Sequence, residues 1–356
     1  MGRVTLQTIA EELGVSRTTV SNAYSRPNQL TPALRERILE TAARLGYGGP
    51  DAAARTLRKG QAGAIGLLFT EPLGFVLSDE FAVSFLHGVA ETAEEHHVGV
   101  VLTSVQGGDK GLDTVKNAVV DGFCIYCCAD DTRATDVIRQ RNLPIVHTYQ
   151  VSDADASYAA IDDHQAAAAA AQHLLDLGHD RIAVIADCGL PPGHLGPLDR
   201  AAIEAYPESD SRSRLAGYLD AYTAAGLDPQ ALQFVYASSN TMGAGNAAMA
   251  HLLEQMPWPT GVLAGTDVLA LGALTALDVH GLTPGREISV VGLDDIPRAS
   301  QAGLTTIRQP GRQKGRTAAS LLLDPPADPD ERRVVLPTEL VARESTGPPP
   351  GLDLRS

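Results

Sequence analysis

The sequence predicts an α/β protein with a small helical head at its amino end and a body of two lobes. Three observations support this. Residues 5–46 hold three short amphipathic helical segments separated by turn residues. From residue 62 onward, apolar strand segments alternate with helical segments, as expected for parallel sheets covered by helices on both faces. The alternation runs through two successive series, so two similar lobes are expected.

Length and charge narrow the class of protein. The chain has 356 residues, of which 44% are hydrophobic, enough for two or three domains. Its formal net charge is −15, but residues 1–60 carry nine Lys or Arg against five Asp or Glu. A basic head on an acidic body indicates that only the head contacts polyanions. With no signal peptide and no apolar run near 18 residues, we expect a cytoplasmic, nucleoid-associated protein that does not enter a membrane.

The first two helices are predicted from their caps. Thr5 can cap a helix over Leu6–Leu13, and Gly14 ends it because glycine accepts the left-handed backbone of a tight turn. Ser16 can then cap a second helix from Arg17 to about residue 25. The apolar spacing along both segments gives each helix one face for a shared core.

A third helix follows and completes the head. Thr31 and Pro32 form a cap followed by proline at the first helical position. Its apolar face is formed by Leu34, Ile38, Ala42 and Leu45. The spacing of Ala10, Gly14 and Val20 is typical of a helix-turn-helix, whose second helix lies in the DNA major groove. The alternative is another kind of small helical bundle.

The body is predicted from its strand segments. In the first series these are AIGLLF, VGVVLTS, GFCIYCC and PIVHT; in the second they are RIAVIA, QFVYAS, GVLAG and ISVVGLDD. Helical stretches separate them. Ligands of such sheets bind at the carboxyl ends of the strands.

The chain resembles the lactose repressor and galactose repressor family of bacterial transcription regulators over almost its whole length. The resemblance rests on VTLQTIAEELGVSRTTVSNAYSRP, LRERILETAARLGY, AARTLRKG and AIGLLF. It implies a body like that of periplasmic sugar-binding proteins, with three crossings between lobes near Ile161, Thr306 and Val334. The implied domains are a head at 1–48, a hinge at 49–61, a first lobe at 62–161 plus about 309–333, a second lobe at 162–306 plus about 334–345, and a flexible tail at 346–356.

The resemblance also implies DNA contacts. Base-contacting positions of the family correspond to Arg17, Thr18 and Asn22. Asn22 departs from the arginine that many members carry, and asparagine pairs best with adenine, so the operator should differ at that base pair. Short hydroxyl side chains suited to phosphates are Thr5, Ser16, Thr19 and Ser21. In the hinge of the family, alanines let two copies of the segment approach each other on the minor groove, and a leucine is wedged between base pairs; this implies Ala54 and Leu57 here, and a plain tether is the alternative.

Effector contacts are implied one motif at a time. SRLAGY gives Arg214, VVGLDD gives Asp294 and LTTIRQP gives Gln309, with a surface ion pair, a cap or lobe packing as the alternatives. Where the family usually has Asn-Asp, this chain has Thr266 and Asp267, which puts the usual sugar contact there in doubt. By analogy, the side chains placed to stack on the effector are Phe75, Phe81 and Tyr149.

Other motifs are weak, and we predict no cofactor, no metal and no catalytic site. Cys124, Cys127 and Cys128 occur in a strand segment and are expected in the core, as no second Cys or His pair has metal-site spacing. The Asp162-Asp163-His164 and His96-His97 runs fit helix ends. Gly243, Gly245 and Ala248 form a Gly-x-Gly-x-x-Ala pattern that is a weak dinucleotide signal. Trp258 is expected to anchor a loop.

Together these features predict a homodimeric, sequence-specific DNA-binding regulator, most simply a repressor. Two identical heads require a near-palindromic double-stranded operator. A small polar effector, a sugar or related metabolite, is expected between the lobes. The competing interpretations are a cytosolic solute-binding protein and an NAD-binding α/β protein.

Overall fold

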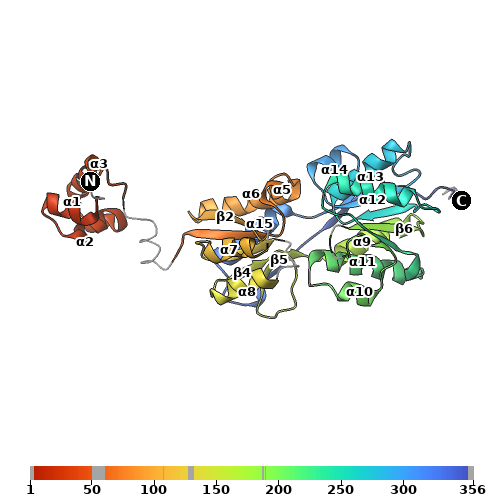
Figure 1. Cartoon of the computed structure of the whole chain (residues 1–356), viewed down its shortest axis with the longest axis horizontal. Coiled ribbons are helices and arrows are strands. Elements are labelled where there is room, and N and C mark those ends of the chain that lie inside the picture. Colours follow the sequence, from red (N-terminus) through yellow and green to blue (C-terminus); the bar gives the residue numbers. More distant parts are fainter. Residues whose placement is uncertain are drawn as a thin grey trace. The chain divides into compact units, whose positions relative to one another are not determined.

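The computed structural model describes residues 4–49, 61–106, 108–126, 132–186, 188 and 190–351. The predicted hinge contacts Ala54 and Leu57 lie outside these residues. The chain divides into two compact units, Met1–Gly63 and Ala64–Ser356. They are called the head and the body below, and each is described by itself (Figure 1).

The head contains the helices that the sequence predicts. They are α1 (Leu6–Leu13), α2 (Arg17–Ser25) and α3 (Pro32–Arg44), with a 3-10 turn η1 at Pro27–Gln29. Thr5 accepts a hydrogen bond from the backbone of Thr8, whose side chain bonds back to the cap. Gly14 has φ of 66°, the left-handed geometry that the predicted turn requires. The caps therefore set the helix boundaries.

The head core is small and made of compact side chains. Its buried members are Ile9, Ala10, Val20, Ala23, Ile38 and Ala42. Ala10 of α1 and Val20 of α2 both belong to this cluster, as expected for a helix-turn-helix. Leu34 and Leu45 are only partly buried and pack at the edge of this cluster, where Tyr24 and Tyr47 meet edge to face.

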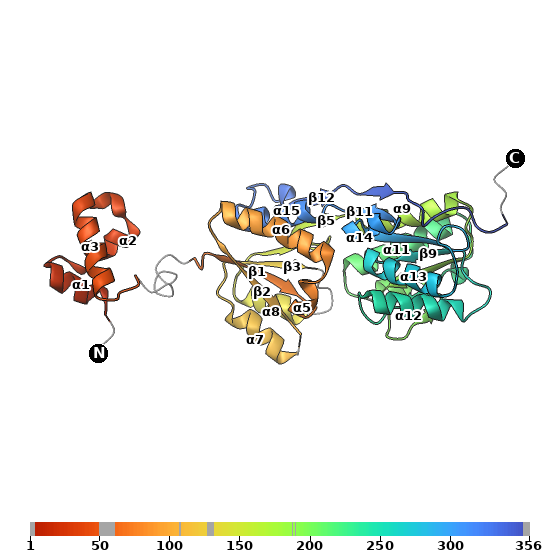
Figure 2. The ribbon, with the colours of Figure 1, turned by 90° about the horizontal axis from the view of Figure 1, so that it is seen from above.

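The first lobe of the body has a six-stranded parallel sheet. Its order is β12 (Arg333–Leu336), β5 (Ser157–Ile161), β4 (Ile145–His147), β3 (Phe123–Tyr126), β1 (Ala64–Phe69) and β2 (Gly99–Ser104). In Figures 1 and 2, α6 (Glu80–Glu95) and α15 (Gly311–Leu323) cover one face, while α7 (Asp109–Asn117) and α8 (Thr132–Gln140) cover the other. A short α5 (Leu73–Val76) precedes α6.

The second lobe has a seven-stranded sheet. Its order is β13 (Glu339–Val341), β11 (Thr305–Arg308), β10 (Ser289–Asp294), β9 (Gly261–Ala264), β6 (Ile182–Ala186), β8 (Gln233–Tyr236) and β7 (Leu195–Gly196). The two edge strands β13 and β7 are antiparallel to their neighbours, which the sequence does not predict. The helices are α9 (Asp163–Asp176), α10 (Arg200–Glu204), α11 (Asp210–Ala224), α12 (Met242–Leu253), α13 (Asp267–Val279) and α14 (Pro297–Gln301), with 3-10 turns at Pro229–Ala231 and, before β12, at Asp330–Arg332.

The chain crosses between the lobes three times, but two crossings lie later than predicted. The first follows Ile161, where β5 leads into α9. The second follows Arg308, because β11 pairs with β10 as far as that residue. The third follows Leu336, because Val334 pairs with Ala159 in the first sheet and cannot belong to the second lobe. Strand register therefore corrects the predicted lobe boundaries by a few residues.

Glycines allow close contact between helices in the body. A Cβ on Gly315 would overlap the Phe85 carbonyl, where α15 packs on α6. A Cβ on Gly245 would overlap the Leu269 carbonyl, where α12 packs on α13. The Gly-x-Gly-x-x-Ala pattern thus lies inside a helix that Thr241 caps, and its second glycine serves helix packing.

Candidate DNA-binding face and effector cavity

The second helix of the head exposes the predicted base-contacting side chains. Arg17 and Thr18 are exposed in the first turn of α2, and Asn22 is half-buried one turn later on the same helix. Val20 and Ala23 face the core, so packing against α1 and α3 fixes the helix and leaves the polar side outward. This arrangement fits a recognition helix.

Asn22 has a partner that the sequence does not suggest. Its amide nitrogen donates to Oε1 of Gln29 over 3.2 Å. Gln29 is the last residue of the turn η1, which packs against α2. One amide hydrogen and the amide oxygen of Asn22 stay available for a base edge. Gln29 therefore orients the side chain that should select the base.

Three of the four hydroxyl side chains predicted for phosphates, those of Thr5, Ser16 and Thr19, lie at helix starts. Thr5 and Ser16 are exposed caps, and Ser16 Oγ accepts from the backbone of Thr19 at 3.0 Å. Thr19 is half-buried, and its hydroxyl lies 2.8 Å from that of Ser16. Ser21 is half-buried in the middle of α2. Capping and DNA contact are compatible here, because a capping oxygen uses only an acceptor site.

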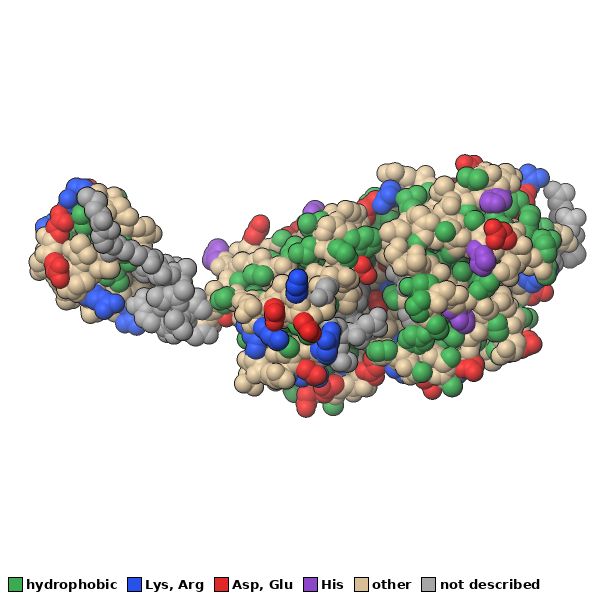
Figure 3. Space-filling model, in the orientation of Figure 1, with side chains coloured by type: hydrophobic (Ala, Val, Ile, Leu, Met, Phe, Trp, Pro, Cys, Tyr) green, Lys and Arg blue, Asp and Glu red, His purple; other side chains and the backbone are tan. Residues whose placement is uncertain are grey.

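A cavity of about 660 Å³ lies in the body, with walls from both lobes. Figure 3 shows the surface hollowed where the two lobes meet. Six of the eight predicted effector residues line it: Phe75, Phe81, Arg214, Thr266, Asp294 and Gln309. Tyr149 and Asp267 are not part of the lining.

Arg214 is fixed at the base of the cavity by three groups. Only 7% of it is exposed. Its Nε donates to Asp163 Oδ1 at 2.8 Å and its Nη1 donates to the Gly265 carbonyl at 2.9 Å, while Nη2 lies 3.8 Å from Asp210 Oδ2. Burial acts to lower the pKa of Arg214, but the charges of Asp163 and Asp210 outweigh burial and hold the pKa well above its ordinary value. The alternative of a surface ion pair is therefore wrong.

Asp294 and Gln309 form a buried pair at the carboxyl ends of β10 and β11. Gln309 Nε2 donates to Asp294 Oδ1 at 2.5 Å. Asp294 ends β10 with φ of 137°, an unusual value for a residue other than glycine. Burial, followed by the charge of Asp267, raises the pKa of Asp294 well above its ordinary value. The Oε1 atom of Gln309 is buried without a hydrogen-bond partner among the described residues.

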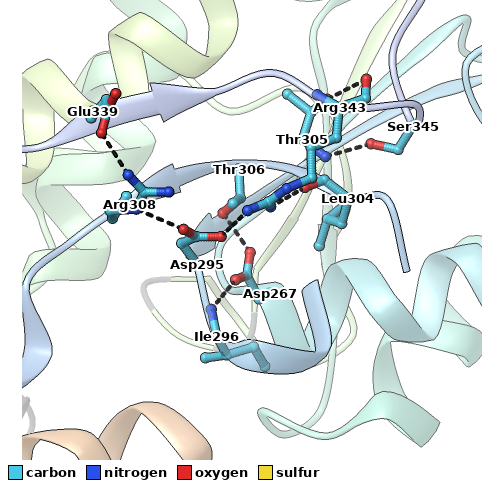
Figure 4. A network of polar contacts seen from close by, with 10 residues as sticks. All are labelled: Asp267, Asp295, Ile296, Leu304, Thr305, Thr306, Arg308, Glu339, Arg343 and Ser345. Carbon is cyan, nitrogen blue, oxygen red and sulfur yellow. Dashed lines mark hydrogen bonds and ion pairs between the residues drawn. The ribbon is translucent and has the colours of Figure 1, made fainter. Parts of the chain in front are cut away.

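Thr266 and Asp267 have structural partners. Thr266 caps α13 and its hydroxyl donates to Asn240 Oδ1 at 2.6 Å. Asp267 is fully buried behind the cavity wall, where it accepts from the Thr306 hydroxyl at 2.6 Å and the Ile296 backbone at 2.9 Å (Figure 4). Burial raises the pKa of Asp267 to about 6. Its carboxylate links α13 to β11 and to the start of α14, and Asp267 is not among the residues that line the cavity.

Tyr149 also lies elsewhere. It is 6% exposed within the core of the first lobe, edge to face with His147 at 5.3 Å between ring centres. Burial lowers the pKa of His147 to about 4. Aromatic side chains that do line the cavity, beyond the two predicted, are Phe69, Tyr126, Tyr206, Tyr218 and Tyr236.

Several contacts between the lobes were not expected from the sequence. Asn240 donates to Asp79 Oδ2 at 3.3 Å, and Arg298 pairs with Glu80. Both join the start of α6 in the first lobe to the second lobe. Such pairs depend on tertiary placement, since their members lie more than 150 positions apart in the chain.

Comparisons with known proteins agree with this geometry. Residues 171–346 match the periplasmic binding protein-like domain. An HTH-type transcriptional regulator of Mycolicibacterium smegmatis is 40% identical to this chain, over 98% of the chain and 97% of the relative. The HTH-type transcriptional regulator IpsA of Corynebacterium glutamicum is 37% identical over 90% of each. A crystal structure of a LacI family transcriptional regulator from Corynebacterium glutamicum is 32% identical with a TM-score of 0.70, covering 98% of this chain and 99% of that one.

The chain belongs to the LacI family of transcriptional regulators. Two further LacI-type structures are similar to it. The lac repressor dimer bound to operator and the anti-inducer ONPF has a TM-score of 0.73 at 26% identity, covering 97% of this chain and all of that one. The CelR–cellobiose complex has a TM-score of 0.66 at 28% identity, covering 96% and 100%. The relatives are regulators, not enzymes, and this LacI-family chain is a DNA-binding regulator controlled by a small effector.

The remaining motifs of this LacI-family chain are structural where they are described. Asp162 caps α9 and His96 ends α6, as expected. Trp258 donates from Nε1 to the Leu253 carbonyl at 2.8 Å, which confirms its role as a loop anchor. Cys124 is buried in β3, and burial raises its pKa to about 12. Cys127 and Cys128 lie outside the described residues.

Cys188 is exposed at the cavity wall, with its sulfur 2.9 Å from the Ser211 hydroxyl. Within the ranges given above, no three His, Cys, Asp or Glu side chains gather as metal ligands would. Across the same ranges, helices with the length and apolar character needed to cross a bilayer are absent.

Proposed function

We propose that this chain is a homodimeric, cytoplasmic repressor that binds a near-palindromic operator and releases or retains it according to a small polar effector. The observation that carries the proposal is the exposed polar side of α2, with Arg17, Thr18 and Asn22 outward from a helix-turn-helix core. A helix held this way presents side chains to base edges in the major groove.

The DNA-binding residues are proposed in two groups. Arg17, Thr18 and Asn22 contact base edges and set sequence preference. Thr5, Ser16, Thr19 and Ser21 contact phosphates and set register. In the hinge, Ala54 and Leu57 are proposed to dock in the minor groove. Because the similar lac repressor is a dimer bound to operator, two heads on a two-fold axis are proposed here too.

The effector is proposed to bind in the cavity against Phe75, Phe81, Arg214 and the Asp294–Gln309 pair. Support comes from the buried polar groups that converge there among aromatic walls, a common composition for small-molecule sites. Closure of the lobes around the effector would alter the spacing of the two hinges. A coupling of about 1 to 3 kcal/mol, or 5- to 150-fold in operator affinity, is typical of such control. No reaction is proposed for this site.

The operator can be found by binding-site selection with the full chain from random duplexes at low ionic strength. We expect enrichment of a two-fold symmetric sequence. Arg17→Ala should weaken binding to the selected duplex, whereas Arg212→Ala in the body should leave it unchanged. Selection of no sequence at all, by protein that is folded and dimeric, would contradict the proposed function.

A further inference from the structure

Lys314 is a charged side chain in the cavity that folding alone does not explain. It lies in the first turn of α15 and is only 1% exposed, yet it lines the cavity. Among the described residues, none forms an ion pair or hydrogen bond with its ammonium group. Buried ammonium groups are costly without a partner, and the start of a helix further disfavours a cation.

Asp163, a buried carboxyl group on which the charge of Lys314 acts, is already bonded to another cation. Burial raises the pKa of Asp163, and the charges of Arg214 and Lys314 act against that rise. The hydrogen bond of Asp163, however, comes from Arg214 Nε. The three ammonium hydrogens of Lys314 thus remain donors aimed at cavity space.

Acceptors without full partners face the same space from Gln309 and Asp294. Gln309 Oε1 has no hydrogen bond, and only one oxygen of Asp294 receives the Gln309 amide. Lys314 belongs to the first lobe, while Asp294 belongs to the second. A ligand that satisfies both needs oxygens that accept from Lys314 and hydrogens that donate to Gln309 or Asp294. Hydroxyl groups do both.

The charge balance disfavours an anionic ligand. Among the described residues that line the cavity, four carry a carboxyl group: Glu71, Asp79, Asp210 and Asp294. Three carry a cationic group: Arg133, Arg214 and Lys314. A phosphate or carboxylate would therefore enter a cavity in which carboxyl groups already outnumber cations, which is costly in a buried site.

We propose that Lys314 is an effector-binding residue that donates hydrogen bonds from the first lobe to an uncharged polyhydroxylated effector, bound on its other side by Asp294 and Gln309. This inference rests on the proposed function of the cavity and adds a specificity residue to it. The ligand joins the lobes because its hydroxyls bond to both walls. Phosphorylated and carboxylated sugars are rejected.

The test compares the full chain with Lys314→Met and with a matched control, Lys116→Met, whose lysine is an exposed residue of α7. Thermal unfolding and calorimetry are run with ribose, glucose, cellobiose and sorbitol, and with ribose 5-phosphate, glucose 6-phosphate and glucuronate. At least one uncharged probe should stabilise the wild type and Lys116→Met, and bind Lys314→Met at least tenfold more weakly, as expected for a lost charged hydrogen bond. The charged probes should have no effect.

A second readout separates a binding role from a structural one. Without any probe, Lys314→Met should unfold at the same or a higher temperature than the wild type, because an unpaired buried cation is removed. A large drop, repeated in Lys314→Gln, would make the lysine structural and overturn the inference. So would equal binding by Lys314→Met, preference for a charged probe, or no binding of any probe. Operator selection by the full chain is measured separately, so failure here is distinct from failure of the DNA-binding proposal.

Discussion

The candidate binding side chains of the head are exposed on one helix, whereas those of the body are buried and come from several elements. In the head, the base-contacting side chains lie on one exposed helix, within a few residues of one another, above a core of six compact residues. In the body, the cavity groups come from α11, β10, the end of β11 and α15, and they are buried and charged. The head can thus change specificity with little effect on folding, whereas cavity changes alter folding and binding together.

The largest expected effect is in the body, at Arg214. Replacing Arg214 with Met leaves Asp163 and Asp210 buried without their cation, which should lower the free energy of unfolding of the body by about 3–5 kcal/mol. Denaturant unfolding measures this. As a control, Arg312→Met removes an arginine of the exposed pair with Glu91, where we expect a loss of about 0–1 kcal/mol. Equal losses would remove the contrast between buried and exposed charge.

Two buried groups, Asp267 in the second lobe and His147 in the first, should make opposite contributions to the pH dependence of stability. The folded-state pKa of Asp267 is raised from 3.8 to about 6, so ionisation is harder in the folded state and stability falls as pH rises through that window. That of His147 is lowered from 6.5 to about 4, so stability rises with pH over its window. Each slope should approach about 1.4 kcal/mol per pH unit.

Variants separate these two slopes. Between pH 4 and 6, the free energy of unfolding of Asp267→Asn should increase more steeply with pH than that of the wild type. That of His147→Asn should increase less steeply than the wild type, or decrease. Unfolding curves across that range test this. Parallel pH profiles for both variants and the wild type would show that neither group titrates as described.

In the head, Asn22→Arg should change the preferred base instead of abolishing binding. Arginine favours guanine where asparagine favours adenine, and discrimination at one base pair is worth about 1–3 kcal/mol. Gln29→Ala should weaken the preference at the same base pair, because the Asn22 amide loses its orienting bond. Binding-site selection with each variant is the measurement. An unchanged profile for Asn22→Arg would refute its role in base contact.

A smaller effect separates helix packing from nucleotide binding in α12. Gly245→Ala should destabilise the body by about 1–3 kcal/mol, because the added Cβ overlaps the Leu269 carbonyl. Gly243→Ala is the matched control, since among the described residues outside its own helix backbone the nearest atom to its added Cβ is the Thr241 hydroxyl oxygen, 4.0 Å away. NAD should leave the fluorescence of Trp258 unchanged in all three proteins. Tight binding of NAD by the wild type, lost in either glycine variant, would support the dinucleotide-binding interpretation.

The sequence predicts the head better than the cavity for a physical reason. Caps such as Thr5 and Ser16 act within one turn, so local sequence defines the helices to the residue. Strand alternation likewise predicts two sheets of parallel strands, but not the antiparallel edge strands β13 and β7 of the second sheet. Whether Val334 pairs in one lobe or the other depends on register with Ala159, which local sequence does not contain.

The cavity residues also divide into those that the sequence reveals and those that only the folded structure reveals. Motif matching found Arg214 and Asp294 because they follow recognisable segments, and the structure brings both to the cavity. It missed Lys314, which resembles any other residue of a polar helix start until α15 is packed against the first sheet. Asp267 and Tyr149 show the reverse error, since a matching position does not reveal that partners within the protein occupy a side chain.

Binding of an effector in the cavity should change the affinity of the head for DNA. Fluorescence anisotropy of the selected operator measures this, by titration with the full chain in the presence and absence of the uncharged probe that most stabilises the protein. We predict a change in the dissociation constant of about 5- to 150-fold, and almost none for Lys314→Met. An operator affinity that stays the same while the probe is bound would contradict the account.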